Sequence, residues 1–240
     1  IVLTPTRELA IQITNYFNTF SIYFDKIPQV ITLIGGESLG TQITSIQQGC
    51  DILVATPGRF LDILTKKQTN FEKLKFLVVD EADKMLDFGF DEQLDLILKS
   101  IPSKRQNLLF SASYPPKVLD IVKKITSNAI DISFENDSET VDTIFQRAIL
   151  VNTEDKRALL KHILKIEKFE QILVFVSSTR LADNLANKFQ KNGYLAQSLH
   201  GKLDQEERNL TLDEFKSKKI KILFATDLLS RGIDRKSTRL

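Results

Sequence analysis

FLVVDEAD at Phe76–Asp83 is the segment of this 240-residue chain that indicates both its fold and its chemistry most clearly. Four apolar residues lead directly into acids, which predicts a buried strand that ends beside Asp80, Glu81 and Asp83. Open α/β sheets bind ligands beside the carboxyl ends of their strands. A carboxylate there can hold Mg²⁺ through the water shell of the ion, a role that we assign to Asp80, and Glu81 can then position or activate an attacking water. Acids in the first turn of a helix are the simpler alternative, but they leave the preceding strand unexplained.

Short apolar runs alternate with helical patterns on both sides of this stretch. Continuous apolar strands fit a parallel sheet buried on both faces, and the alternation predicts an α/β fold with right-handed crossovers. Strands are expected at 1–3, 30–34, 52–55, 76–79, 108–110, 147–151, 172–176, 196–199 and 222–225, and helices at 7–20, 57–66, 90–99, 116–126, 154–165, 180–191 and 204–217.

A polar, acidic stretch, FENDSETVDT at 134–143, interrupts this alternation. Its composition is typical of a flexible linker between two compact units. We therefore predict a first domain at 1–134, a linker at 135–143 and a second domain at 144–240, with no extensive interface between the two domains.

Composition excludes few classes of protein. Hydrophobic residues make up 42% and charged residues 27% of the chain, as in ordinary globular proteins. There is neither a membrane-length apolar run nor a basic-then-apolar leader, and Cys50 is the single cysteine, so we expect a cytoplasmic protein without a membrane partner. Residues 1–153 carry 15 basic against 19 acidic side chains, and residues 154–240 carry 18 against 12. A polyanion bound to the second half would suit this asymmetry, although scattered surface charge explains it as well.

Further motifs follow in a definite order along the chain. They are PTRELA at 5–10, Gly35-Gly36, TPGR at 56–59, DEAD at 80–83, SAS at 111–113, VFVS at 174–177, His200-Gly201, Gln205 with Arg208, ATD at 225–227 and RGID at 231–234. Their joint order and spacing resemble the DEAD-box family of RNA helicases over nearly the whole chain. The resemblance implies two tandem RecA-like parallel-sheet domains, both incomplete, in an enzyme that couples hydrolysis of ATP with Mg²⁺ to the remodelling of RNA.

The early motifs suit contacts with an RNA backbone. PTREL and TPGR each place a proline and a threonine at a helix start, where free N–H groups can meet a phosphate. Ordinary capping and turn chemistry is the alternative for each string alone, and only the family match favours RNA. Such contacts read backbone and not base, so we expect sequence-independent binding of single strands or short duplexes. With the positions that the resemblance adds in the second half, the RNA-binding residues are Pro5, Thr6, Arg7, Gly36, Thr56, Pro57, Arg59, Arg208 and Thr226.

The resemblance also assigns catalytic and nucleotide-binding residues. Ser111-Ala112-Ser113 stands where the family has Ser-Ala-Thr, and the retained hydroxyl of Ser113 can keep its hydrogen bond. The catalytic set is therefore Asp80, Glu81, Asp83, Ser111 and Ser113. Gly232 is expected to approach the nucleotide and Asp234 to reach the ATP ribose. His200, beside a glycine, is interpreted as a turn residue.

Some motifs of the family are missing from the chain. It contains no GxxxxGK[ST] phosphate loop, no upstream glutamine segment that reads adenine, and no arginine-rich motif after RGID. We therefore expect a fragment, cut at both ends, that does not hydrolyse ATP by itself. A non-catalytic RNA-binding module is the alternative hypothesis, whereas an unrelated ATPase with a similar strand leaves the second-half motifs unexplained. Residues 154–157 and SASYPP at 111–116 resemble a bacterial branch of the family.

Overall fold

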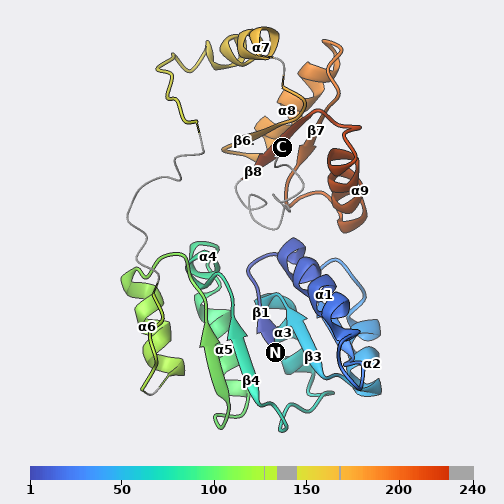
Figure 1. Cartoon of the computed structure of the whole chain (residues 1–240), viewed down its shortest axis with the longest axis vertical. Helices are drawn as coiled ribbons and strands as arrows, with labels where there is room; N and C mark the ends of the chain where they lie inside the picture. The colour runs from blue at the N-terminus through green and yellow to red at the C-terminus, as the bar shows by residue number, and fades with distance from the viewer. Residues whose placement is uncertain (127, 134–144, 168, 227–240) are drawn as a thin grey trace.

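Two separate parallel sheets form in the computed structural model, which describes residues 1–126, 128–133, 145–167 and 169–226 (Figure 1). The first sheet has the strand order β2-β3-β1-β4-β5 and the second has the order β6-β8-β7. The strands are β1 (Val2–Leu3), β2 (Val30–Leu33), β3 (Ile52–Ala55), β4 (Phe76–Val79), β5 (Gln106–Leu109), β6 (Ile172–Val176), β7 (Ala196–Leu199) and β8 (Ile222–Thr226).

Helices cover both faces of each sheet, as parallel strands require. They are α1 (Arg7–Ser21), α2 (Leu39–Gln48), α3 (Pro57–Lys66), α4 (Ala82–Asp87), α5 (Asp91–Ser100), α6 (Pro116–Ile125), α7 (Lys156–Ile166), α8 (Thr179–Gln190) and α9 (Gln205–Lys216). Among the helices that the structure describes, none has both the length and the apolar character needed to cross a membrane.

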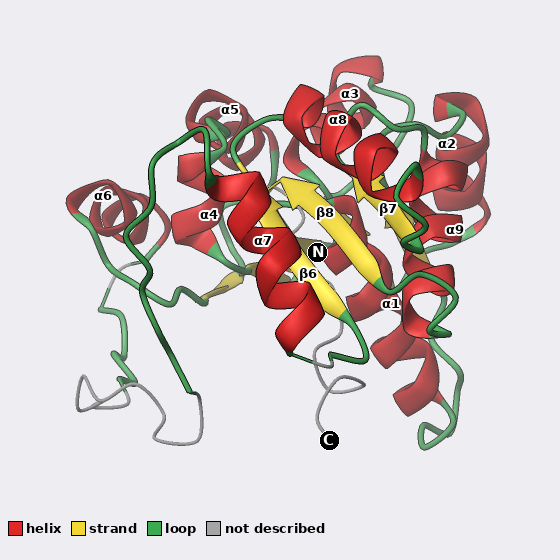
Figure 2. Cartoon of the chain, turned by 90° about the horizontal axis from the view of Figure 1, so that it is seen from above, coloured by secondary structure: helices red, strands yellow, loops and turns green. Residues whose placement is uncertain are grey.

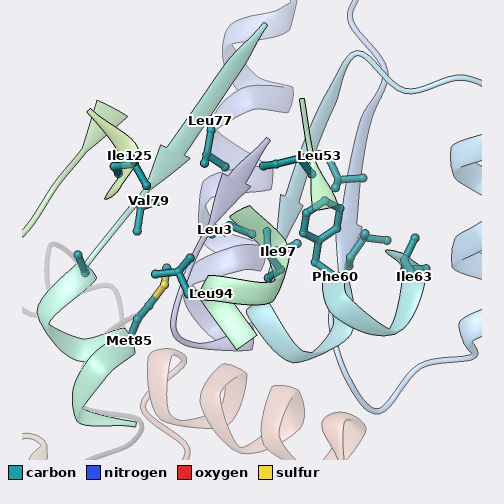
Figure 3. Close-up of a cluster of buried hydrophobic side chains, with 14 of the residues drawn as sticks. Leu3, Leu53, Phe60, Ile63, Leu77, Val79, Met85, Leu94, Ile97 and Ile125 are labelled. Carbon is teal, nitrogen blue, oxygen red and sulfur yellow. The ribbon is translucent and has the colours of Figure 1, made fainter. Parts of the chain in front are cut away.

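The period of two along a strand divides the first core between the two faces of the sheet. Val2 and Val54 pair in register and pack with Ala10 of α1 on one face. Their neighbours Leu3 and Leu53 point to the other face, which α3, α5 and α6 cover. Figure 3 shows this larger cluster, in which Phe60, Ile63, Leu77, Leu94 and Ile97 are almost completely buried.

The second sheet has the same two-faced core on a smaller scale. Leu223 and Ala225 of β8 pack with Leu212 and Phe215 of α9 on one face. Phe224, between them in the sequence, packs on the opposite face in a cluster to which α7 and α8 contribute. Because the strands of each sheet are parallel, their carboxyl ends lie together at one edge of that sheet, where α/β proteins bind ligands.

One expected strand does not form. Residues 147–151 have no strand structure, and the side chains of Ile149 and Leu150 are exposed. An apolar, β-prone run becomes a strand only when a neighbouring strand completes its ladder of hydrogen bonds. Among the described residues, β6 pairs only with β8, and nothing in that part of the chain pairs with 147–151.

Two helices escaped prediction, whereas the other expected strands and helices are confirmed to within a few residues. Helix α2 was missed because Gly40, Thr41 and Thr44 have low helix propensities, although its sequence is amphipathic. The side chain of Ser38 caps this helix. Helix α4 has six residues, too few to show a helical period. The proposed linker lies in 134–144, outside the described residues, so the domain boundaries stay a prediction.

Candidate active site

Asp80 lies directly beyond β4, at the carboxyl edge of the first sheet. Its backbone N–H donates to the carbonyl of Leu3 at 2.9 Å, which holds it beside the central strand β1. Its Oδ1 accepts a hydrogen bond from the N–H of Glu81 at 2.9 Å. Burial nevertheless raises the pKa of the Asp80 carboxyl, and the hydrogen bond from Glu81 opposes this only in part. The site therefore holds a desolvated carboxylate, which a cation would stabilise.

Glu81 adopts a strained backbone conformation. Its φ of 49° and ψ of 51° lie in the left-handed region, which residues other than glycine, asparagine and aspartate rarely occupy. It stands at the start of α4, and the N–H of the next residue, Ala82, donates to the carbonyl of Phe110 at 3.0 Å. Strain of this kind costs on the order of 1–3 kcal/mol and collects at functional sites. The strained residue is the one to which the sequence assigned the attacking water.

Asp83 and the SAS motif form one hydrogen-bonded network. The N–H of Asp83 donates to Ser111 Oγ at 3.2 Å, and Ser113 Oγ donates to Asp83 Oδ2 at the same distance. Ser111 Oγ donates in turn to the carbonyl of Ser113 at 2.6 Å. Asp83 is buried, and its carboxylate accepts the hydrogen bond from Ser113, whereas Ser111 accepts from its backbone. The serine at the third position thus makes the hydrogen bond that links β5 to the acids after β4.

Ser113→Ala should destabilise the chain by about 1 kcal/mol, because it leaves an oxygen of a buried carboxylate without its donor. The free energy of unfolding in urea measures this effect. Ser113→Thr is the matched control and should leave stability unchanged, because it keeps the hydroxyl. Equal stability of the alanine variant and the parent would show that the hydrogen bond contributes nothing.

The residues at this edge fit a magnesium ion that arrives with phosphates. Mg²⁺ is usually bound through one or two carboxylates together with waters and substrate phosphates. Asp80 supplies one such carboxylate. In the part of the chain that the structure describes, no group of three or more histidines, cysteines or acids could hold a metal by itself. A single carboxylate such as Asp80 fits a magnesium ion that phosphates and waters also bind.

Arg7 links the Gly35–Gly36 turn to the second half of the chain. Its Nη1 donates to Gln205 Oε1 at 3.3 Å, and its guanidinium lies against both glycines. A Cβ built on Gly36 would lie 2.9 Å from Arg7 Nη1, and the φ of Gly36 is +91°. The positive φ therefore favours glycine at this position, and a larger side chain would also displace the flexible end of Arg7 from the turn.

Glu8 and Arg208 form a buried ion pair between α1 and α9. Arg208 Nη2 lies 2.5 Å from Glu8 Oε1. Arg208 is 3% exposed and Glu8 is 5% exposed. Burial lowers the pKa of the Arg208 guanidinium, and the neighbouring Glu8 opposes that shift. Gln205 and Arg208 are three residues apart on α9 and lie on one face of that helix, since both contact α1. Arg208 directs its charge to Glu8 in this arrangement, and its contact with RNA stays a prediction.

The TPGR motif begins α3 as expected, with Pro57 at the start of the helix. Thr56 occupies the N-cap position, but its side chain makes no capping hydrogen bond with the helix. Arg59 Nη1 donates to the carbonyl of Glu37 and to Gln42 Oε1, both at 3.0 Å. TPGR therefore holds the segment that follows the Gly35–Gly36 turn.

The remaining predicted residues lie at the same edge or outside the described residues. Thr6 caps α1 by accepting from the N–H of Leu9 at 3.2 Å, and both Thr6 and Pro5 are buried. Thr226 is the last residue of β8. Gly232 and Asp234 lie outside the residues that the structure describes.

His200 belongs to a buried structural network. Its Nε2 lies 2.8 Å from Asp183 Oδ1, to which Ser198 Oγ also donates at 2.6 Å. These contacts join β7 to α8 in the second half.

Sequence reasoning missed two side chains of this site, Glu8 and Gln42. An acid in the first turn of a helix is expected on electrostatic grounds alone, so Glu8 carried no separate signal. Gln42 is buried in a helix that the sequence did not reveal, where its amide donates to the carbonyl of Ile34 at 3.2 Å. Only the packing of α2 and α3 brings Gln42 to Arg59.

Two family models divide the chain as the two sheets do. The DEAD/DEAH box helicase model matches residues 1–121, and the helicase conserved C-terminal domain model matches residues 155–240. The first match covers more than half of the chain. The chain therefore belongs to the DEAD/DEAH box helicase family.

Its relatives come from several kingdoms. It is 37% identical to the ATP-dependent RNA helicase DBP2 of Chaetomium thermophilum and 36% identical to the DEAD-box ATP-dependent RNA helicase CshA of Bacillus subtilis, over 98% of the chain in each case. It spans 43% and 47% of those two proteins, less than half of their lengths. Eukaryotic and bacterial relatives are about equally similar, so the bacterial branch stays a prediction.

Solved structures of the family share the fold. Saccharomyces cerevisiae Dbp5 bound to RNA and ADP BeF3 matches with a TM-score of 0.80 at 29% identity, over 96% of this chain and 58% of that one. A DEAD box protein from Methanococcus jannaschii matches with a TM-score of 0.52 at 35% identity, over 97% of this chain and 62% of that one. The tandem RecA-like fold is thereby confirmed.

Proposed function

We propose that this chain is part of an ATP-dependent RNA helicase that binds RNA through its backbone and uses Mg²⁺-bound ATP to separate strands locally. The observation that carries the proposal is the position of three motifs on neighbouring strands. PTREL follows β1, TPGR follows β3 and the DEAD acids follow β4, and the sheet places these strands side by side in the order β3-β1-β4. Phosphate-binding helix starts and the magnesium-binding acid therefore share one edge of the sheet.

The contacts between the two halves support a closed arrangement, in which RNA and ATP bind at the same time. The fold of this chain matches Dbp5 bound to RNA and ADP BeF3 with a TM-score of 0.80. It matches Dbp5 bound to Gle1 and IP6 with a lower TM-score of 0.67. In this chain α1 meets α9 through Arg7–Gln205 and Glu8–Arg208. We infer that RNA and ATP draw the halves together across this junction and that hydrolysis reopens it.

Within this proposal each residue has a limited task. Mg²⁺ would neutralise charge on the ATP phosphates, held through water by Asp80. Glu81 orients a water and accepts its proton, and the Asp83–Ser113 hydrogen bond ties this edge to β5. Gly232 and Asp234 remain proposed contacts to the nucleotide.

A non-catalytic RNA-binding module is the second candidate, because the proposed contacts with the RNA backbone do not depend on ATP hydrolysis. The two candidates differ in ATP turnover and agree in RNA binding.

Arg59→Ala should lower RNA affinity by about tenfold for all sequences alike and reduce the salt slope of binding by about one, because it removes a cation from a phosphate-binding helix start. Fluorescence anisotropy with labelled poly-U, poly-A and mixed strands across a salt series measures both effects. Lys104→Ala, an exposed cation at the opposite edge of the sheet, is the matched control. A loss confined to one sequence would contradict backbone recognition.

A further inference from the structure

A row of basic side chains follows one face of α7 in the second half of the chain. Arg157, Lys161 and Lys165 are spaced by four residues, so they lie on one side of the helix, about 6 Å apart along its axis. None of the motifs that define the family includes these three residues.

The end of α8 extends this row. Lys161 Nζ donates to Asn192 Oδ1 at 2.9 Å and lies 5.9 Å from the centre of the Phe189 ring. Lys188 and Lys191 flank Phe189 in the sequence, and both are exposed. These five cations, Arg157, Lys161, Lys165, Lys188 and Lys191, form a surface that we call the basic ridge.

The charges of the ridge are not neutralised within the protein. None of the five forms an ion pair with any residue in the described ranges, whereas Arg147 nearby pairs with Glu167 and Lys218 pairs with Glu170. Like charges four residues apart destabilise a helix by about 0.2–0.5 kcal/mol per pair. The helix dipole favours Lys165 and Lys188 near the ends of their helices, but it disfavours Arg157 in the first turn of α7. Stability of the fold alone therefore does not account for the row.

The ridge leads away from the edge that carries the motifs. Helix α7 runs antiparallel to β6, the next strand along the chain (Figure 2). Arg157 thus lies near the carboxyl edge of the second sheet, where Thr226 ends β8. Lys165, in the last turn of α7, therefore lies toward the opposite edge, and the hydrogen bond from Lys161 to Asn192 holds the end of α8 beside α7.

We propose that the basic ridge binds the phosphates of an RNA segment, such as a duplex arm, that continues beyond the strand held at the carboxyl edge of the sheets. An extended row of unpaired cations suits a continuous polyanion, because phosphate neutralisation releases counterions and needs no base contact. Lysine is depleted in the cores of protein interfaces, which makes an acidic protein the weaker candidate. The inference rests on the proposed function, since it extends the same RNA.

The test compares two RNAs on the parent chain and on the triple variant Arg157→Gln/Lys161→Gln/Lys165→Gln. One RNA is a single strand of about eight nucleotides, within the usual range for one single-strand site. The other carries the same strand joined to a hairpin of about twelve base pairs, long enough to present a duplex backbone. The matched control, Lys66→Gln/Lys73→Gln/Lys104→Gln, removes the same charge from exposed lysines of the first half. Thermal unfolding by circular dichroism verifies that both variants fold.

We expect the ridge variant to bind the tailed hairpin about tenfold more weakly, with a salt slope lower by about two, and to bind the short strand within about twofold of the parent. The control variant should bind both RNAs like the parent. If the ridge variant lost affinity equally for both RNAs, or if the control variant lost as much affinity, the effect would come from net charge alone and the proposal would be wrong. Unchanged binding of the hairpin would also overturn it and leave the ridge to an acidic protein or to solvent. Failure of the parent to bind the short strand would count against the proposed function, while a hairpin affinity that still depends on the ridge would support this inference.

Discussion

Glu81→Gln should abolish ATP turnover in a polypeptide that joins this chain to a GxxxxGK[ST] phosphate loop, and it should leave nucleotide binding largely intact. The amide keeps the shape of the side chain but cannot accept the proton of the attacking water, a contribution of about 10²–10⁴ in rate. Glutamine can keep the left-handed backbone of Glu81 at the same cost, so the melting temperature should stay the same. Steady-state phosphate release with and without RNA, and the affinity of a fluorescent nucleotide, measure the two effects.

Asp80→Asn is the matched comparison, because it is also an acid-to-amide change at the same edge of the sheet. It should weaken Mg²⁺-dependent nucleotide binding as well as turnover, since the carboxylate that holds the ion is lost. The 240-residue chain alone should release no phosphate in either form. Full activity of the Glu81→Gln polypeptide would show that the attacking water lies elsewhere. An inactive parent polypeptide would favour the RNA-binding module.

Arg208→Met should separate the two halves of the chain when they have closed on RNA and nucleotide, because it leaves the Glu8 carboxylate buried without its cation. Breaking a buried ion pair from one side costs about 3–5 kcal/mol, which shifts the docking equilibrium more than a hundredfold. Opening the junction exposes Glu8 to water, so the cost should appear as undocking while each half stays folded. Small-angle scattering should then report a larger radius of gyration, and the amides of α1 and α9 should exchange hydrogen faster.

A double variant separates the ion pair from simple loss of packing. Glu8→Leu/Arg208→Met removes both charges, and apolar replacement of a buried pair is often neutral or stabilising. The double variant should therefore dock again and restore slow exchange in α1 and α9. An Arg208→Met variant that docks like the parent would show that other contacts hold the halves together.

Most of the architecture could be predicted because buried parallel strands have a strong local signature. Continuous apolar runs such as Phe76–Val79 need no tertiary information to be recognised as strands. The run at 147–151 shows the limit of this reasoning, because its strand character depends on a neighbour that the described residues do not supply. Helix α2 shows the opposite error, since weak local propensity was overcome when Ile43 entered the core.

Within the candidate site, the residues at the carboxyl edge of the first sheet could be predicted from the amino-acid sequence. Strand direction and motif order were enough to place Asp80, Glu81 and Ser111 there. Two features of the site could not be predicted in this way. They are the left-handed backbone of Glu81 and the buried ion pair between Glu8 and Arg208. The difference arises from how far apart in the chain the interacting residues lie. A strand and the residue after it are set by neighbours in the chain, whereas a buried ion pair between residues 200 positions apart exists only after two folded units have excluded water from the same place.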